Sequence, residues 1–201
     1  MNISGGSLLH TIAKSIMPTY NSITLHGVYM DIFGLGVLLT GNSGIGKSEI
    51  ALGLISRGHR LIADDSIEFY KDEKTNEGAV TGKCPELLKN FLEVRGLGIL
   101  NIKEMFGENA IKNDIPLQLV THLIDASDLE IKSDDRLHGM HSKLNILSTD
   151  IARVVIPVGP GRNLSVLLET AVRNHRLRCS GYNASKDFIN RQKDFLDSQQ
   201  S

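Results

Sequence analysis

The stretch "GVLLTGNSGIGKSE" (residues 36–49) decides the fold, because it joins an apolar run to a glycine-rich turn and the start of a helix. The run at 36–40 predicts a strand buried on both faces. Residues 47–57, "KSEIALGLISR", predict a helix that ends at Gly58. Residues 41–48 between them match G-x-x-x-x-G-K-[ST] at every fixed position. The pattern predicts a phosphate-binding loop, and its strand and helix context disfavours the alternative of a chance glycine-rich turn.

The chemistry of such a loop follows from its residue types. Glycines let successive backbone N–H groups turn towards phosphate oxygens, and the helix N-terminus adds partial positive charge. Lys47 would reach the β- and γ-phosphates, and the Ser48 hydroxyl would ligate Mg²⁺. The predicted nucleotide-binding residues are Gly41, Asn42, Ser43, Gly44, Ile45, Gly46, Lys47 and Ser48.

Strands and helices alternate along the rest of the chain. Residues 22–41, "SITLHGVYMDIFGLGVLLTG", predict two adjoining strands, the first with Val28, Met30 and Ile32 on one face and the second at 36–40. Other apolar runs predict strands at 59–65, 115–126 and 151–158, with an exposed hairpin over 68–85. Helical spacing predicts helices at 8–17 (stopped by Pro18), 85–92, 163–177 and 184–197, the last capped by Asn183 or Ser185. We therefore expect a single α/β domain over 1–201 with a mixed sheet, in which 1–20 is an N-terminal helix or linker.

Composition narrows the class of protein. The chain has 201 residues, 41% of them hydrophobic and 22% charged, which is typical of a soluble globular domain. A net charge of -1 gives no broad nucleic-acid footprint. Two cysteines, Cys84 and Cys179, are read as reduced thiols. The first residues make a poor signal peptide, and no apolar run approaches ~18 residues. We expect a cytoplasmic protein that contacts neither nucleic acid nor membrane.

A phosphate-binding loop alone does not choose a reaction. A GTPase should also carry an N/T-K-x-D motif, and the nearest strand-end acid, in "HLIDAS" (122–127), lacks the lysine. A predicted strand ends in Asp64 and Asp65, where an acid commonly helps to hold Mg²⁺. Adjacent acids on an extended chain point to opposite faces, so only one is expected to face the γ-phosphate. The alternative is an Asp-Asp turn that caps the next segment.

Two further stretches combine charge with glycine. "LEVRGLGILNI" (92–102) holds Glu93 and Arg95 in an apolar run, where their burial would require pairing or ion binding; a structural salt bridge is the alternative. "PVGPGRN" (157–163) is either a mobile loop that touches phosphate or a connector.

These motifs together resemble a known family. "HGVYMDIFGLGVLLTGNSGIGKSE" (26–49), "RGHRLIADD" (57–65), "EVRGLGILNI" (93–102), "DRL" (135–137) and "IPVGPGRNL" (156–164) occur in the order found in the catalytic domain of bacterial HPr kinase/phosphorylase. Leu25, between Thr24 and His26, is a departure. The resemblance runs from about residue 20 to about 190 and implies a P-loop domain of the phosphoenolpyruvate-carboxykinase-related kinase fold, assembled as a homohexamer, here without the family's N-terminal domain.

The resemblance also implies an activity. Such enzymes use ATP and Mg²⁺ to phosphorylate one serine of HPr, the phosphocarrier of the sugar phosphotransferase system. They reverse this by phosphorolysis, in which inorganic phosphate is the co-substrate and pyrophosphate leaves. Asp65 resembles the general base, which returns the proton in phosphorolysis, and Asp64 its acidic neighbour. Ser48 and Glu93 resemble the Mg²⁺ ligands; His26, Lys47 and Arg136 match further active-site positions.

The resemblance also assigns roles to two whole segments rather than to single residues. The signature region, implied in both activities, is Leu92, Glu93, Val94, Arg95, Gly96, Leu97, Gly98, Ile99, Leu100 and Asn101. The loop implied in dephosphorylation is Pro157, Val158, Gly159, Pro160, Gly161 and Arg162.

Some positions keep a plainer interpretation beside the functional one. Without the resemblance, His26 is a strand histidine that is simply packed. His138 replaces the family's glycine after "DRL", which leaves the place of Arg136 less defined; His138 and His141 are interpreted as a flexible polar loop rather than a metal pair. Arg173, Arg176 and Arg178 form a solvated helix face or contact an acidic partner or subunit.

Two rival functions remain open from the sequence. A small-molecule kinase could use the same loop and acid pair, and would turn over ATP with small alcohols without labelling protein. A non-catalytic nucleotide sensor could use the loop alone, but sensing needs neither Asp65 nor Glu93.

Overall fold

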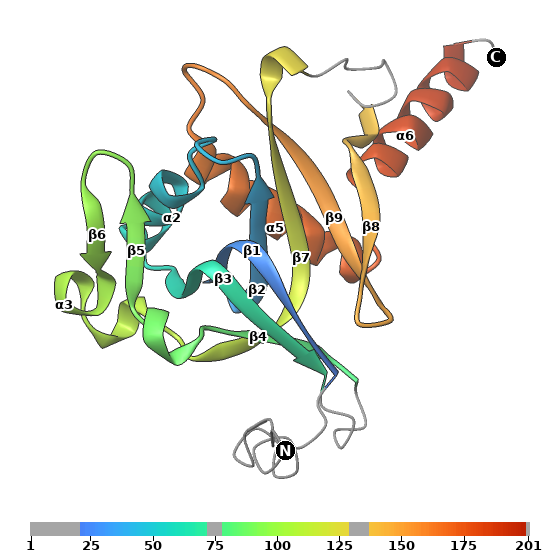
Figure 1. The fold of residues 1–201 in the computed structure, drawn as a ribbon. Coiled ribbons are helices and arrows are strands. Elements are labelled where there is room, and N and C mark those ends of the chain that lie inside the picture. The colour runs from blue at the N-terminus through green and yellow to red at the C-terminus, as the bar shows by residue number, and fades with distance from the viewer. Residues whose placement is uncertain (1–20, 72–77, 129–136, 200–201) are drawn as a thin grey trace, which may run out of the picture.

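The computed structural model describes residues 21–71, 78–128 and 137–199 (Figure 1). Its strands are β1 (Asn21–Ile32), β2 (Leu35–Gly41), β3 (Arg60–Lys71), β4 (Val80–Lys83), β5 (Phe91–Val94), β6 (Gly98–Asn101), β7 (Asp114–Asp125), β8 (His141–Ile146) and β9 (Thr149–Val158). Its α-helices are α2 (Lys47–Ile55), α3 (Ile102–Phe106), α5 (Leu164–Cys179) and α6 (Ala184–Gln199). None of these described helices has the length and apolarity needed to cross a lipid bilayer.

The main sheet is mixed and partly closed. Seven strands follow the order β2-β1-β3-β4-β7-β9-β8, and β2 pairs with β7 as well, so β2, β1, β3, β4 and β7 form a closed ring. Closure is favourable because it leaves no edge strand within the ring. The predicted α/β domain with a mixed sheet is confirmed; the ring was not predicted.

The interior of the ring is one of two hydrophobic cores. It contains apolar side chains from all five strands, among them Tyr29, Leu38, Phe69, Val80, Ile115, Leu117 and Val120. The Tyr29 hydroxyl donates to the carbonyl oxygen of Ile115 at 2.8 Å, and its ring meets Phe69 edge to face. A buried tyrosine hydroxyl needs such a partner, so this bond fixes β1 against β7.

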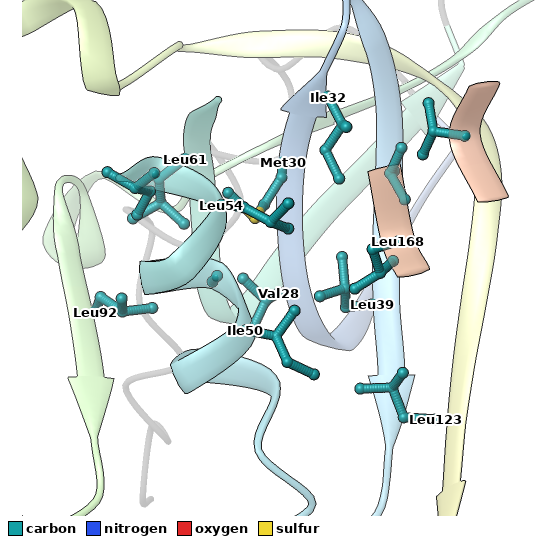
Figure 2. Close-up of a cluster of buried hydrophobic side chains, with 14 of the residues drawn as sticks. Val28, Met30, Ile32, Leu39, Ile50, Leu54, Leu61, Leu92, Leu123 and Leu168 are labelled. Carbon is teal, nitrogen blue, oxygen red and sulfur yellow. The ribbon is translucent and has the colours of Figure 1, made fainter. Parts of the chain in front are cut away.

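The second core lies on the outer face of the sheet, where α2 and α5 cover it (Figure 2). The predicted face of β1 contributes Val28, Met30 and Ile32, all fully buried. Helix α2 adds Ile50 and Leu54, and α5 adds Leu168. Residues 36–40 are buried on both sides as predicted, with Val37 and Leu39 in the outer core and Leu38 inside the ring.

The direction of three strands positions the glycine-containing loops. β2 and β9 both run parallel to β7, with Gly41 opposite Leu123 and Val158 opposite Asp125. The carboxyl ends of parallel strands lie at one edge of a sheet, which is where α/β proteins usually bind ligands. The loops at 41–46 and 159–163 therefore leave the sheet at the same edge.

Several predicted elements differ from the structure. β3 does not end at Asp65 but continues to Lys71, where it pairs with β4 and confirms the hairpin. Residues 85–92 are not a helix: one 3₁₀ turn spans Glu86–Leu88, and Phe91 and Leu92 join β5, because pairing with β6 overrides local propensity. His141 begins β8 rather than lying in a loop.

The C-terminal helix begins as predicted. The Asn183 side-chain oxygen accepts from the Lys186 amide at 3.1 Å, so Asn183 rather than Ser185 is the cap. Helix α6 has no buried residue and projects from the body of the domain (Figure 1). The predicted helix at 8–17 and the hairpin tip at 72–77 lie outside the described residues.

Candidate active site

The glycine-rich loop folds around the Lys47 ammonium. Lys47 Nζ donates to the carbonyl oxygens of Gly41 and Asn42, at 2.9 and 3.1 Å. Only 8% of the residue is exposed, so these bonds satisfy a largely buried cation. Gly44 and Gly46 have φ angles of 79° and 96°, in the left-handed region that glycine adopts without strain. Gly46 is the residue before α2, so the loop ends on a helix N-terminus. This geometry combines a buried cation with backbone amides at a positive helix end.

A cavity of about 160 Å³ lies over this loop. It brings together predicted residues from four segments that are far apart in the sequence. Its lining comprises His26, Gly27, Ser43, Gly44, Gly46, Lys47, Ser48, Glu49, Asp64, Asp65, Glu93 and Arg95. Gly27 and Glu49 were not predicted as site residues; their only sequence signal is that each directly follows a predicted one.

Asp65 corrects the expectation that only one acid faces the cavity. Its φ angle is 68°, so the backbone leaves the extended conformation and the strict alternation of side chains is lost. Asp65 therefore lines the cavity beside Asp64. Asp65 Oδ1 lies 2.9 Å from His26 Nδ1, and both side chains are largely exposed. His26 is thus not simply packed.

Asp64 connects β3 to the neighbouring hairpin. Its Oδ2 accepts from the Glu93 backbone N–H at 2.9 Å. Burial raises the pKa of the Asp64 carboxyl, and the nearby charges of Asp65 and Glu93 add to the rise. Two acids in one cavity therefore sit in different environments, one partly buried and one paired with an imidazole.

The β5–β6 hairpin carries the predicted signature region, and it corrects a second expectation. Leu92 and Val94 are buried, whereas Glu93 and Arg95 are exposed on the face towards the cavity. No buried salt bridge is needed there. The Arg95 guanidinium lies over the glycine-rich loop. A Cβ atom added at Gly44 would be only 3.1 Å from Arg95 Nη1, which shows how close the two are. The hairpin thus supplies one acid and one cation to the cavity.

Other predicted residues lie elsewhere. Residues 157–162 do not line the cavity, and Arg162 Nη1 donates to the Pro157 carbonyl oxygen of its own loop at 3.3 Å. Arg136 lies outside the described residues. Both cysteines are free, Cys84 buried and Cys179 exposed. Within the described part of the chain, no three histidine, cysteine or acidic side chains are grouped to hold a metal by themselves.

These observations define a class of protein: a mixed α/β domain with a lysine-containing glycine loop at the end of a parallel strand, facing an acid pair. The chain belongs to the HPr serine kinase C-terminal domain family, whose model matches residues 19–192.

Individual relatives agree with this assignment. HPr kinase/phosphorylase of Chromobacterium violaceum is 46% identical over 180 residues, 90% of this chain and 56% of the relative. HPr kinase/phosphorylase of Azoarcus sp. strain BH72 is 50% identical over 174 residues, 87% of this chain and 54% of the relative. The solved Hpr(Ser) kinase/phosphatase from Coxiella burnetii superposes with a TM-score of 0.73 at 36% identity, covering 83% of this chain and 98% of that one. The chain spans about half the length of the curated relatives it matches.

Proposed function

We propose that this chain is the catalytic domain of an ATP- and Mg²⁺-dependent protein-serine kinase that phosphorylates HPr and reverses the modification by phosphorolysis. The observation that carries the proposal is the shared cavity of Lys47, Ser48 and the Asp64–Asp65 pair. Phosphoryl transfer needs in-line positioning and charge neutralisation more than covalent chemistry, and these residues supply both. The names and close similarity of the relatives support it.

In the kinase direction, the loop at 41–48 holds the nucleotide phosphates, and the substrate serine approaches from the side of Asp65. The Asp65 carboxylate accepts the hydroxyl proton as the serine oxygen bonds to the γ-phosphorus and the bond to ADP breaks. A positioned general base typically increases the reaction rate by ~10²–10⁴-fold. His26 orients Asp65 through the 2.9 Å contact. Lys47 and Arg95 offset the charge on the transferring group.

The donor set of the cavity fits a magnesium ion. Ser48 and Glu93 present a hydroxyl and a carboxylate, the oxygen ligands that Mg²⁺ prefers. Mg²⁺ commonly retains waters and uses one or two carboxylates plus substrate phosphates, so a complete protein cage is not required. When bound, the ion would neutralise charge on the nucleotide phosphates.

In phosphorolysis, an oxygen of inorganic phosphate bonds to the phosphorus of phosphoserine, the serine oxygen leaves, and pyrophosphate forms. Asp65 returns its proton to the departing serine oxygen. We assign residues 157–162 to this direction, because their loop leaves the sheet at the same edge as the loop at 41–46. The assembly proposed with this function is a cytoplasmic homohexamer.

The deciding experiment is to incubate the chain with Mg·ATP and purified HPr and to read the intact mass of HPr. We expect a gain of one phosphoryl group, absent with HPr that carries alanine for its target serine. Lys47→Ala should abolish the gain while leaving the circular dichroism spectrum unchanged, because the point charge on the phosphates is lost. A folded Lys47→Ala variant that labels HPr at the wild-type rate contradicts the assignment of the loop. ATP turnover with small alcohols and unlabelled HPr would identify a metabolite kinase, and binding without turnover a nucleotide sensor.

A further inference from the structure

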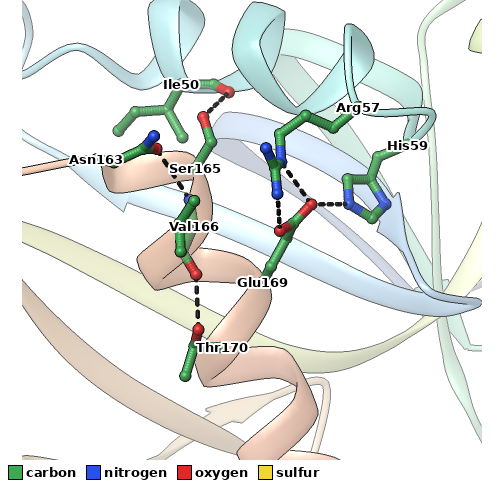
Figure 3. A network of polar contacts seen from close by, with 8 residues as sticks. All are labelled: Ile50, Arg57, His59, Asn163, Ser165, Val166, Glu169 and Thr170. Atoms are coloured by element: carbon green, nitrogen blue, oxygen red, sulfur yellow. Dashed lines mark hydrogen bonds and ion pairs between the residues drawn. The ribbon is translucent and has the colours of Figure 1, made fainter.

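Helices α2 and α5 each begin directly after a glycine-containing loop. Helix α2 follows the loop at 41–46, and α5 follows the loop at 157–162 with the Asn163 side chain accepting from the Val166 amide at its start. The two helices lie against each other and are joined by a set of polar contacts (Figure 3). None of these contacts lies in the cavity described above.

The contacts follow the same order along both helices. Ser165 Oγ donates to the Ile50 carbonyl oxygen over a long 3.5 Å, and a Cβ atom at Gly53 would lie 2.5 Å from the same Oγ. One turn further along, Glu169 pairs with Arg57 and His59, which follow the end of α2. Residues further along α2 therefore contact residues further along α5. The helices run in the same direction, and their N-terminal loops lie at the same end.

Glu169 is the centre of this set, which we call the α2–α5 clasp (Arg57, His59 and Glu169). Arg57 donates to both carboxylate oxygens, at 2.7 and 2.6 Å, and His59 Nε2 lies 2.9 Å from Glu169 Oε1. The side chains of Glu169 and His59 are only 13% and 6% exposed. The Glu169 carboxylate is thus shielded although the Arg57 side chain is 44% exposed, and a two-pronged arginine–carboxylate pair favours one geometry.

The clasp also contacts the turn between β1 and β2. The His59 ring meets Phe33 edge to face with centroids 4.6 Å apart, and the Arg173 guanidinium lies 4.1 Å above the Phe33 ring. The α2–α5 pair is thus fixed to the same strands that lead into the loop at 41–46. The relative position of α2 and α5 is therefore fixed both by the clasp and by these contacts with Phe33.

We propose that Glu169 is a positioning residue that sets the separation of the two loops, and that phosphorolysis depends on it far more than phosphorylation does. The inference rests on the proposed function. Phosphorylation uses the loop at 41–48 alone for its phosphates, whereas phosphorolysis uses both loops in one reaction. A shift between α2 and α5 therefore disturbs only the reverse step, and small misplacements of reacting groups have large effects on rate.

The kinetic test compares Glu169→Gln with a matched control. Asp187→Asn removes the other two-pronged arginine–carboxylate pair, with Arg191, which lies on the exposed helix α6. We expect Glu169→Gln to lower kcat/KM for phosphorolysis on the order of tenfold, chiefly through a higher KM for inorganic phosphate, with phosphorylation changed less than about twofold. Asp187→Asn should leave the ratio of the two rates unchanged. Equal losses of both rates in Glu169→Gln, or none, overturn the proposal.

A distance measurement tests the positioning without any turnover. Spin labels are attached to Glu49→Cys and Pro160→Cys, both exposed positions, in a Cys179→Ser background. The remaining Cys84 is buried, and burial raises the pKa of its thiol to about 11, so it resists labelling. We expect one narrow distance distribution that Glu169→Gln broadens or shifts, and an unchanged distribution overturns the proposal. A wild-type chain that fails to label HPr would refute the proposed function instead, while this measurement still decides on the clasp.

Discussion

His26 Nδ1 and Asp65 Oδ1 lie 2.9 Å apart across the paired strands β1 and β3. Their side chains are 61% and 72% exposed, so the contact adds little to stability. Its consequence is orientational: the imidazole holds one carboxylate oxygen and leaves the other to face the cavity. For this reason the proposed function assigns proton exchange with the substrate to Asp65 rather than to the partly buried Asp64.

Asp65→Asn tests this role, because the amide keeps the size of the side chain but cannot accept the serine proton. The kinase rate should fall by ~10²-fold or more while nucleotide affinity changes little. Single-turnover labelling of HPr together with equilibrium nucleotide binding measures both quantities. If affinity rather than rate falls, Asp65 holds the nucleotide and the assignment is wrong.

Glu93→Gln should raise the Mg²⁺ concentration needed for activity, because it removes a carboxylate that we assign to the ion. Titration calorimetry of nucleotide binding at several Mg²⁺ concentrations gives a readout independent of turnover. The side chain is exposed, so folding should be unaffected. If Glu93→Gln instead loses the kinase rate at saturating Mg²⁺ and its dependence on Mg²⁺ is unchanged, Glu93 is the base and Asp65 the metal ligand.

Arg162→Ala should reduce pyrophosphate release from phosphorylated HPr far more than it reduces phosphorylation of HPr. Inorganic phosphate needs its own cation, and Arg162 is exposed and donates to the Pro157 carbonyl oxygen of its own loop. Both rates are measured on one preparation. Equal losses would mean that the loop serves docking or folding, and unchanged rates would make it a connector.

Asp31→Asn should destabilise the domain by about 1–3 kcal/mol, because a buried carboxylate that accepts from Arg60 and Lys112 is replaced by a neutral amide, while both cations remain partly exposed to water. The Asp31 side chain is 2% exposed and accepts from the Gly34 amide, Arg60 and Lys112 at 2.7–2.9 Å. Urea unfolding measures the change. Asp150→Asn, in an exposed pair with Lys143, is the control and should change stability by about 1 kcal/mol or less.

The clasp predicts a specific loss of stability in acid. Hydrogen bonding from Arg57 is the main cause that lowers the pKa of Glu169 to about 2, against ~4.3 for an unfolded chain. The unfolded state then binds more protons, so this contribution to stability is complete above about pH 5 and is lost as the pH falls towards 2. The difference in unfolding free energy between wild type and Glu169→Gln should shrink over that range. A difference independent of pH would contradict the prediction.

The sequence predicted the elements that depend on local patterns. The buried strand before Gly41, the helix from Lys47 and the strands at 115–126 and 151–158 are all confirmed, because apolar runs and glycine turns specify them directly. The closing of β2 on β7 joins residues some 80 positions apart, as Leu38 and Val120 show, and no local pattern carries that information.

For the candidate site, the sequence predicted which residues lie together better than it predicted how they are arranged. The loop motif pointed to Lys47, and the family resemblance implied His26 and Asp65; all three line the cavity, but the positive φ of Asp65 arises within the paired strands and is invisible in composition. The apolar neighbours of Glu93 and Arg95 left open whether these two side chains are buried and paired; strand alternation turns them outward. Glu169 carries no sequence signal, since one acid on an amphipathic helix is ordinary.

The closed ring of β2, β1, β3, β4 and β7 also determines how the domain comes apart. Freeing any one of these strands breaks two rows of hydrogen bonds and admits water to the interior, so partial opening costs nearly as much as global unfolding. His26, the loop after Gly41 and the acid pair all stand on this unit. Among the described residues, the β5–β6 hairpin has no strand pairing with the ring; Leu92 and Val94 in the outer core and the Asp64–Glu93 hydrogen bond attach it instead. One wall of the cavity is therefore held by closed strand pairing, while the wall that carries Glu93 and Arg95 is held by side-chain packing and one hydrogen bond to Asp64.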